Sequence, residues 1–372
     1  MKLIKFSKIN VEKKDLNEVK KIISSGWLTH GKYTSLFEEE LKKFTGAKYS
    51  ITVSSCTAAL HLSCLALKLK KGDEVIVPAQ THTATAHAVE YTGAKAVLVD
   101  VDEITGNISY KELIKKINNK TKAIILVHMA GFPCDIKKIL NYCNQKNVKV
   151  IEDCAHALGT ITENKHAGNF GVTGCFSFYP TKQITTGEGG ALITNNKNIY
   201  NKIKILKAFG IDKDINLRKK PGVYDVKDLG FNFRMTDFQA ALGYFQLKRY
   251  SKNLQRRHEI AKRYIKNLRN NSNINHMPYS QNCSFFIFQI FTKKRDSLIK
   301  HLKEKNIQFS IHYAKSLNNM TYYKKKYNLK KNLFKNSIKY GQTCISLPVY
   351  PKLKNKEVDY ISKSINEFFL NE

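Results

Sequence analysis

The sequence lacks any long apolar run, because no stretch reaches the roughly 18 to 20 apolar residues that a membrane-spanning helix needs. Its first residues, MKLIKFSKINVEKKDL, place lysines where a signal peptide carries its apolar core. None of the eight cysteines forms a CxxC pair, and several lie within apolar stretches, which is typical of buried thiols in a reducing compartment. We therefore expect a cytoplasmic protein without a membrane segment, disulfides, zinc or another metal site.

Acidic residues are also scarce: 30 Asp and Glu stand against 63 Lys and Arg, for a formal net charge of +33. From residue 241 onward the sequence has 27 Lys and Arg against 7 Asp and Glu. Such an excess attracts polyanions in general. However, only eight of the basic residues are Arg, and neither Arg-rich blocks nor the aromatic motifs of RNA-binding modules occur. We expect a solvated lysine-rich surface, or alternatively a basic funnel for an anionic small molecule, and no nucleic-acid partner.

The 372 residues, 42% of them hydrophobic, can bury the core of one large or two ordinary domains. In the first 200 residues, short β-branched runs alternate with helical patterns, which is typical of a parallel sheet with crossover helices. The pattern then predicts one long helix over 236–268, a strand over 285–291 and further helices. We therefore predict an α/β fold with a large, mostly parallel sheet domain at 1–240 and a smaller α+β domain at 241–372. The strands predicted for the first domain are 74–77, 95–101, 123–128, 148–153, 175–179 and 191–194, and its helices are 57–69, 83–91, 109–117 and 136–146.

The carboxyl edge of such a sheet is where ligands bind, because loops and helix N-termini converge there. One apolar strand ends in Asp153, and a carboxylate at that position is costly to desolvate unless a cation meets it. The next strand leads to Lys182 on a glycine-rich turn. Residues 55–57 stand at the start of a helix, where free backbone N–H groups form a phosphate site. A phosphate site, a lysine and a carboxylate at one edge are the parts that pyridoxal 5'-phosphate requires.

These residues suggest a division of labour. Lys182 would form a Schiff base with the coenzyme aldehyde and later act as the general base. Asp153 would pair with the pyridine nitrogen and keep it protonated, although it could instead only cap its loop. The phosphate would be held by the helix start, whose hydroxyls could equally be simple N-caps, and by one further serine. This set is Ser55, Cys56, Thr57 and Ser177.

Four motifs together resemble the DegT/DnrJ/EryC1/StrS family of fold type I, pyridoxal-phosphate-dependent sugar aminotransferases. They are SCTAALHL at 55–62, EDCAH at 152–156, SFYPTKQITTGEGG at 177–190 and GFNFRMTDFQAA at 230–241, and the resemblance extends from about residue 24 to CISLPVYP at 344–351. It implies an aspartate aminotransferase-like fold and a homodimer with active sites at the subunit interface. It also implies L-glutamate as amino donor and a keto group on a nucleotide-linked sugar as acceptor, and we expect this acceptor to be a 4-keto-6-deoxy sugar.

The resemblance also assigns roles by position. Lys182 matches the Schiff-base lysine, Asp153 the partner of the pyridine nitrogen, and Ser177 a serine that contacts the phosphate. His156 stands where the family often has glutamine near the coenzyme's 3-hydroxyl, and His82 stands where an aromatic ring usually covers the coenzyme. Both histidines could also be ordinary hydrogen-bonded residues near the core.

Further positions match residues outside the coenzyme's immediate surroundings. Asn232 matches an asparagine that the neighbouring subunit lends toward the phosphate. Thr29 and Gly31 match an N-terminal segment near the substrate, and His312 and Tyr313 match a second such segment near the C-terminal domain.

Three departures from the family pattern stand out. Cys56 replaces the usual glycine, which excludes an easy positive φ at that position. Tyr179 replaces a frequent histidine, and the sequence HYAK at 312–315 lacks the proline that often follows the tyrosine. Lys182 is retained, whereas dehydrating relatives have histidine there, so transamination is favoured. The alternatives are amination of a 3-keto nucleotide sugar or a small phosphorylated ketone, a non-catalytic coenzyme-binding regulatory protein, and a basic nucleic-acid-associated protein.

Overall fold

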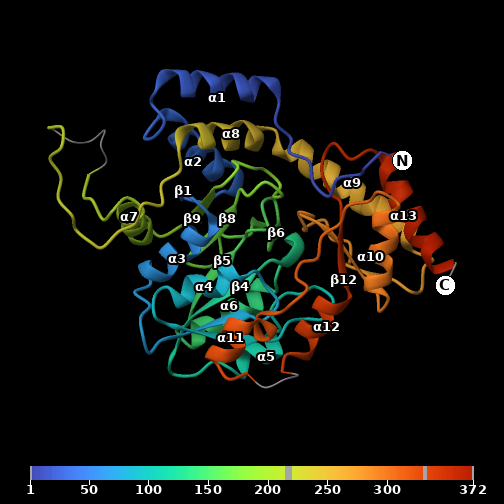
Figure 1. The fold of residues 1–372 in the computed structure, drawn as a ribbon. Coiled ribbons are helices and arrows are strands. Elements are labelled where there is room, and N and C mark those ends of the chain that lie inside the picture. The colour runs from blue at the N-terminus through green and yellow to red at the C-terminus, as the bar shows by residue number, and fades with distance from the viewer. Residues whose placement is uncertain (1, 214–219, 330–332, 371–372) are drawn as a thin grey trace.

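The computed structural model describes residues 2–213, 220–329 and 333–370 (Figure 1). Its main sheet has seven strands: β1 (Tyr49–Val53), β2 (Glu74–Pro78), β3 (Lys95–Val99), β4 (Thr121–Val127), β5 (Lys149–Asp153), β8 (Thr173–Ser177) and β9 (Gly190–Thr194). Their spatial order is β1-β9-β8-β5-β4-β2-β3. From β8 to β3 along this order, each strand is parallel to the next. Only β9 runs antiparallel to both of its neighbours, β1 and β8. The predicted α/β fold with a large, mostly parallel sheet is confirmed.

Both faces of this sheet are buried, which explains why its strands read as continuous apolar runs. Alternate residues of one strand enter different cores, as in β4, where Ala123 and Ile125 join one cluster while Ile124 and Leu126 join the other. Helices cover each face. They are α2 (Lys32–Thr45), α3 (Cys56–Ala66), α4 (Thr83–Glu90), α5 (Tyr110–Ile114), α6 (Ile136–Gln145), α7 (Lys197–Leu206) and α8 (Asp237–Lys248), and α1 (Lys13–Ser25) packs on α8.

The last third of the chain builds a second core around a three-stranded antiparallel sheet of order β10-β11-β12. Figure 1 shows the described start of the chain near helices α9 and α13 of this part. The predicted domain boundary at 240/241 falls inside α8, and the division into 1–240 and 241–372 stays a prediction. The elements here are α9 (Tyr250–Leu268), β10 (Asn275–His276), β11 (Phe288–Phe291), α10 (Arg295–Glu304), α11 (Thr321–Lys326), α12 (Lys335–Thr343), β12 (Cys344–Leu347) and α13 (Asn355–Leu370). Shorter elements elsewhere are the hairpin β6 (Ile161–Thr162) and β7 (Lys165–His166) and the 3₁₀ turns η1 (Met129–Gly131) and η3 (Leu317–Asn319).

The single long helix predicted over 236–268 is wrong, because the chain forms two helices, α8 and α9. They are separated at Arg249, whose backbone leaves the helical region with φ −109° and ψ 8°. The Arg249 guanidinium donates to the Asp15 carboxylate at 3.0 Å and to the Asn10 carbonyl at 2.8 Å. The break therefore lies where the N-terminal segment is anchored on the junction.

The strand predicted over 285–291 begins only at Phe288. The backbone N–H groups of Ser284 and Phe286 donate to the carbonyls of Gly131 and Ala130, both at 3.1 Å. These residues are therefore hydrogen-bonded to the turn after β4 and not to the small sheet.

Two further findings bear on the expectations from composition. No helix in the described part of the chain is long and apolar enough to cross a membrane. All eight cysteines are buried as free thiols.

Candidate active site

Asp153 ends β5 as a buried carboxylate, 4% exposed. Its Oδ2 accepts a hydrogen bond from the Thr85 hydroxyl at 2.8 Å, and its Oδ1 accepts one from the Ala155 N–H at 3.0 Å. No cationic side chain of the described residues forms an ion pair with it. Burial raises the pKa of Asp153, and its hydrogen bonds together with the nearby Lys182 and His82 offset this effect only in part. Among the described residues the carboxylate therefore has no direct ion-pair partner of the kind that stabilises a buried charge.

Lys182 follows β8 on the turn before β9 and is partly buried. Its Nζ lies 4.3 Å from the centroid of the Phe286 ring, a cation–π arrangement. Burial lowers the pKa of Lys182 to about 8, although the neighbouring Cys56 and Asp153 act in the opposite direction. Part of the Lys182 population thus carries a free amine near neutral pH, which nucleophilic chemistry requires.

The start of α3 provides the candidate phosphate site. Ser55 is the N-cap residue, and its Oγ accepts a hydrogen bond from the Ala58 N–H at 3.1 Å. The N–H groups of Cys56 and Thr57 head the helix, where the free donors and the helix dipole favour an anion. Ser177 ends β8 at the same edge.

Cys56 fits this position without a positive φ, because it is the first residue of a regular helix. Its Sγ lies 4.0 Å from Asp153 Oδ1. The close approach at this point is made by Gly190 of β9, where an added Cβ would lie 2.4 Å from the Cys56 nitrogen. Gly190 therefore has a packing reason to be glycine.

Aromatic and imidazole rings from distant segments gather beside Lys182. His156 is stacked on Phe286, with ring centroids 4.4 Å apart, and its Nε2 lies 3.2 Å from the Tyr313 hydroxyl. The rings of His82 and His312 lie 5.7 Å and 5.3 Å from that of Tyr313. Burial lowers the pKa of His312 to about 3 and that of His156 well below its usual value, and nearby Lys182 acts in the same direction. These imidazoles are therefore neutral at physiological pH.

The remaining predicted site residues lie apart from this cluster within the single chain. Thr29 is exposed, and Gly31 lies so close to Asp237 of α8 that an added Cβ would be 2.2 Å from Oδ2. Asn232 is exposed and its backbone pairs with Ala208 in an isolated bridge. The roles suggested for these residues stay predictions.

Sequence reasoning missed two contributors to the cluster. Thr85 stands three residues after His82 in THTATA, and this spacing places it in the first turn of α4, where its hydroxyl reaches Asp153. Phe286, in contrast, has no local signal, because it lies 104 positions from Lys182 in an apolar stretch that reads as a strand.

A second group of potential metal ligands, His128, Glu152 and Cys154, is buried beside β5, with one ligand atom of each within 4.8 Å of the others. The Glu152 carboxylate already accepts four hydrogen bonds, from three backbone N–H groups of the loop 168–171 and from His128. Burial alone would raise the pKa of Glu152, but the bonds from His128 and the loop outweigh it and lower the pKa. The lone pairs are thus in use, and the group is best explained as a buried anchor for this loop.

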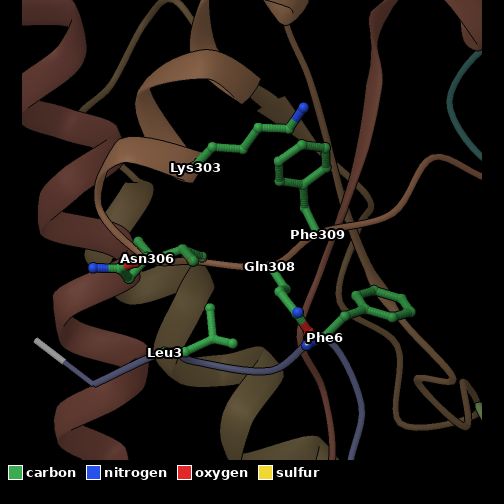
Figure 2. A pocket seen from close by; sticks show the side chains of 7 residues that line it. Leu3, Phe6, Lys303, Asn306, Gln308 and Phe309 are labelled. Atoms are coloured by element: carbon green, nitrogen blue, oxygen red, sulfur yellow. Dashed lines mark hydrogen bonds between the residues drawn. The ribbon is translucent and has the colours of Figure 1, made fainter.

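A surface groove of about 370 Å³ lies between the N-terminal residues 3–6 and the segment 303–309 (Figure 2). Figure 2 shows the Lys303 side chain extending beside the Phe309 ring. The N-terminal segment forms this groove because Ile4 pairs with Ile307 in a parallel bridge. The groove does not include Lys182 or Asp153.

The residues at the sheet edge fit pyridoxal 5'-phosphate. A protonated pyridine nitrogen would supply the direct ion-pair partner that Asp153 lacks among the described residues, and the amine of Lys182 could react with an aldehyde. The start of α3 would hold the phosphate.

The comparisons with known proteins agree with this chemistry. The family model described as the DegT/DnrJ/EryC1/StrS aminotransferase family matches residues 10–366. GDP-perosamine synthase of Escherichia coli O157:H7 is 36% identical over 99% of both chains. The structure is similar to Helicobacter pylori PseC, an aminotransferase involved in the biosynthesis of pseudoaminic acid, with a TM-score of 0.93, 29% identity and full coverage of both chains. It also resembles the PLP-form of Spr1654 from Streptococcus pneumoniae, a sugar aminotransferase by its description, with a TM-score of 0.91, 29% identity and 99% coverage of both chains.

Proposed function

This chain belongs to the DegT/DnrJ/EryC1/StrS aminotransferase family and is a pyridoxal-phosphate-dependent sugar aminotransferase; on that premise, we propose that it transfers the amino group of L-glutamate to a nucleotide-linked keto-deoxy sugar. The proposed acceptor is a 4-keto-6-deoxy sugar. The observation that carries the proposal is the proximity of a partly buried amine of lowered pKa, Lys182, to the buried carboxylate of Asp153, which forms no ion pair among the described residues.

Two observations support an anionic sugar as the acceptor. The relative GDP-perosamine synthase is named for a nucleotide-linked sugar product, and it matches this chain over nearly its whole length. The formal charge of +33 favours association with a diphosphate-bearing substrate over long distances.

The residues of the site divide the work as follows. Bound pyridoxal phosphate supplies an aldehyde that takes up amino groups and a ring that accepts electrons. The Lys182 Nζ, when neutral, can remove a proton from the carbon that bears the donor's amino group, and as an ammonium it can return one. Asp153 would hold a proton at the ring nitrogen, and Ser55, Cys56 and Thr57 would hold the phosphate, with Ser177 as a further donor.

The rings around Lys182 would complete the site. His82 would cover the coenzyme ring, and His156 would lie near its 3-hydroxyl. His312 and Tyr313 would contact the substrate. Burial keeps His156 and His312, whose rings lie beside Phe286, uncharged. These two histidines therefore act as neutral hydrogen-bonding groups.

We also propose that the enzyme works as a homodimer in the cytoplasm, with Asn232 contributed to the partner's site. Large apolar side chains near the N-terminal substrate segment and in the 223–229 segment are exposed, Trp27 at 54% and Leu229 at 85%, and a second copy would cover such surface. Mixing Lys182→Ala with Asn232→Ala protein should then restore about a quarter of the wild-type activity, because half of the dimers are mixed and each mixed dimer has one intact site. Mixtures that stay as inactive as their components would contradict shared sites.

The transaminase itself is tested with coenzyme-loaded protein, L-glutamate and a panel of acceptors. The panel holds 4-keto-6-deoxy and 3-keto nucleotide sugars and small phosphorylated ketones, and products are identified by mass. We expect an aminated 4-keto sugar together with 2-oxoglutarate. Lys182→Ala should lower turnover by roughly 10²–10⁴-fold, whereas Lys197→Ala, an exposed lysine on α7, should leave it unchanged.

The other outcomes identify the alternatives. Amination of only a 3-keto sugar or a phosphorylated ketone would replace the proposed acceptor but keep the reaction class. If the protein binds the coenzyme but forms no 2-oxoglutarate from glutamate, the proposed reaction is wrong and a regulatory coenzyme-binding role is favoured.

A further inference from the structure

The two ring nitrogens of His156 have different partners. Nδ1 accepts a hydrogen bond from the backbone N–H of Ala130 at 3.3 Å, and Nε2 lies 3.2 Å from the hydroxyl oxygen of Tyr313. The ring is 2% exposed and is stacked on Phe286 at 4.4 Å and 24°. Its orientation is thus held by packing on one face and by a hydrogen bond at each nitrogen.

This arrangement determines the tautomer of His156. A backbone N–H can only donate, so Nδ1 must be unprotonated. Burial keeps the pKa of His156 well below its usual value, and Lys182, His312 and His82 all act in the same direction. The ring is therefore neutral, its single proton lies on Nε2, and Nε2–H donates to the Tyr313 oxygen.

The direction of this bond leaves the Tyr313 proton unused. A tyrosine hydroxyl carries one hydrogen, and among the described residues His156 is the only hydrogen-bond partner of this hydroxyl. Burial raises the pKa of Tyr313, so the proton stays on the oxygen at physiological pH. The backbone of Tyr313 is also fixed in position, because the buried Gln80 donates a hydrogen bond from Nε2 to the Tyr313 carbonyl at 2.8 Å.

We propose that His156 is a positioning residue that makes the Tyr313 hydroxyl a hydrogen-bond donor to an oxygen anion bound beside Lys182. Lys182 and His156 both contact the Phe286 ring: Lys182 Nζ lies 4.3 Å from its centroid, and the His156 ring is stacked on it. The oxygen would belong either to the coenzyme ring or to the carboxylate of the amino donor. This inference rests on the proposed aminotransferase site but concerns a contact 157 residues apart within this chain.

The tautomer can be measured without coenzyme or activity. Full-length protein with ¹⁵N-labelled histidine is studied by long-range ¹H–¹⁵N NMR, and the His156 signals are identified by their loss in His156→Gln. We expect the Nε2–H form, unchanged between about pH 6 and 9. An Nδ1–H form, or a ring that becomes charged in this range, would overturn the proposal.

The donor role is tested with coenzyme-loaded variants. Tyr313→Phe removes the hydroxyl, and His156→Leu removes the hydrogen bond that directs it. Each variant should therefore bind the ligand that carries the accepting oxygen roughly ten- to hundredfold more weakly, which is the effect of losing a hydrogen bond to a charged group. The double variant should lose no more than either single variant, because both act through one bond. His156→Gln, whose amide can still donate to Tyr313, should stay within about threefold of wild type.

The ligand is identified by which quantity changes. If the oxygen belongs to the coenzyme, these variants shift the pH titration of its visible absorbance band and lower its affinity. If it belongs to the donor, the band is unchanged and the KM for L-glutamate and the Kd of maleate, a dicarboxylate probe, rise instead. Unchanged spectra and unchanged ligand affinity in Tyr313→Phe would refute the proposal.

A matched control is present elsewhere in the chain. His258 lies 3.3 Å from the Tyr279 hydroxyl in a second His–Tyr pair outside the site, so His258→Leu should alter neither the spectrum nor the KM. These measurements do not depend on the sugar acceptor. Failure to aminate any keto sugar would overturn the proposed function, whereas the tautomer and the coenzyme spectrum would still decide this inference.

Discussion

Replacing Glu152 by Gln should mainly lower the stability of the protein, whereas replacing its neighbour Asp153 by Asn should mainly lower its coenzyme affinity, although both carboxylates are buried on β5. Glu152 accepts four hydrogen bonds, from His128 and from the loop 168–171, and its pKa is lowered by them. Asp153 accepts hydrogen bonds from Thr85, from Ala155 and, at 4.0 Å, from the Cys56 thiol, it forms no ion pair among the described residues, and burial raises its pKa. One carboxylate is therefore satisfied by the protein, and the other is not.

The expected magnitudes follow from this difference. Glu152→Gln disrupts a buried, fully hydrogen-bonded charge and should lower the free energy of unfolding by about 3–5 kcal/mol. Asp153→Asn removes a charge that burial disfavours, so the coenzyme-free protein should change by less than about 1 kcal/mol. Its coenzyme affinity should fall, because a charge-assisted hydrogen bond contributes about 1.5–3 kcal/mol, which corresponds to roughly 10- to 150-fold in Kd.

The assay measures both quantities on each variant. Urea denaturation of coenzyme-free protein at one protein concentration gives the free energy of unfolding, and an absorbance titration gives the Kd for pyridoxal phosphate. The reasoning is refuted if Asp153→Asn destabilises the coenzyme-free protein as much as Glu152→Gln does. It is equally refuted if Asp153→Asn binds the coenzyme as tightly as wild type.

Three further changes have defined outcomes. In coenzyme-free protein, acetylation of Lys182 followed by peptide mass spectrometry should speed up with rising pH and level off above about pH 8, because its ammonium form is lost near that value; a profile like that of an exposed lysine would contradict the lowered pKa. Ser55→Ala should lower the free energy of unfolding by about 1 kcal/mol in urea denaturation, since a first-turn N–H of α3 loses its acceptor. The N-cap variant Ser109→Ala should show a similar loss of stability. Only Ser55→Ala should also weaken coenzyme binding. Gly190→Ala should lower the melting temperature or the soluble yield, because its Cβ would lie 2.4 Å from the backbone nitrogen at the start of α3; a wild-type melting temperature would show that this contact relaxes at no cost.

The sequence by itself determined the local elements that carry the candidate chemistry. An apolar run that ends in Asp153, and a second that leads to Lys182, predict strands from neighbouring residues alone, and parallel strands share a carboxyl edge. Ser55 before an apolar helical stretch likewise predicts an N-cap and free N–H donors. Each of these features depends on residues only a few positions apart, so periodicity and turn chemistry were sufficient to find them. The four family motifs lie in the same segments.

Only the tertiary structure decided what meets those groups from the rest of the chain. Strand order decided that β9 lies antiparallel between β1 and β8. Contacts between segments more than 100 residues apart decided the break between α8 and α9 at Arg249 and the position of the Phe286 ring next to the Lys182 amine. The same holds for the bond from His156 to Tyr313. Local preferences contain no information about such contacts, because their free energy arises from packing and desolvation that exist only once the chain has folded.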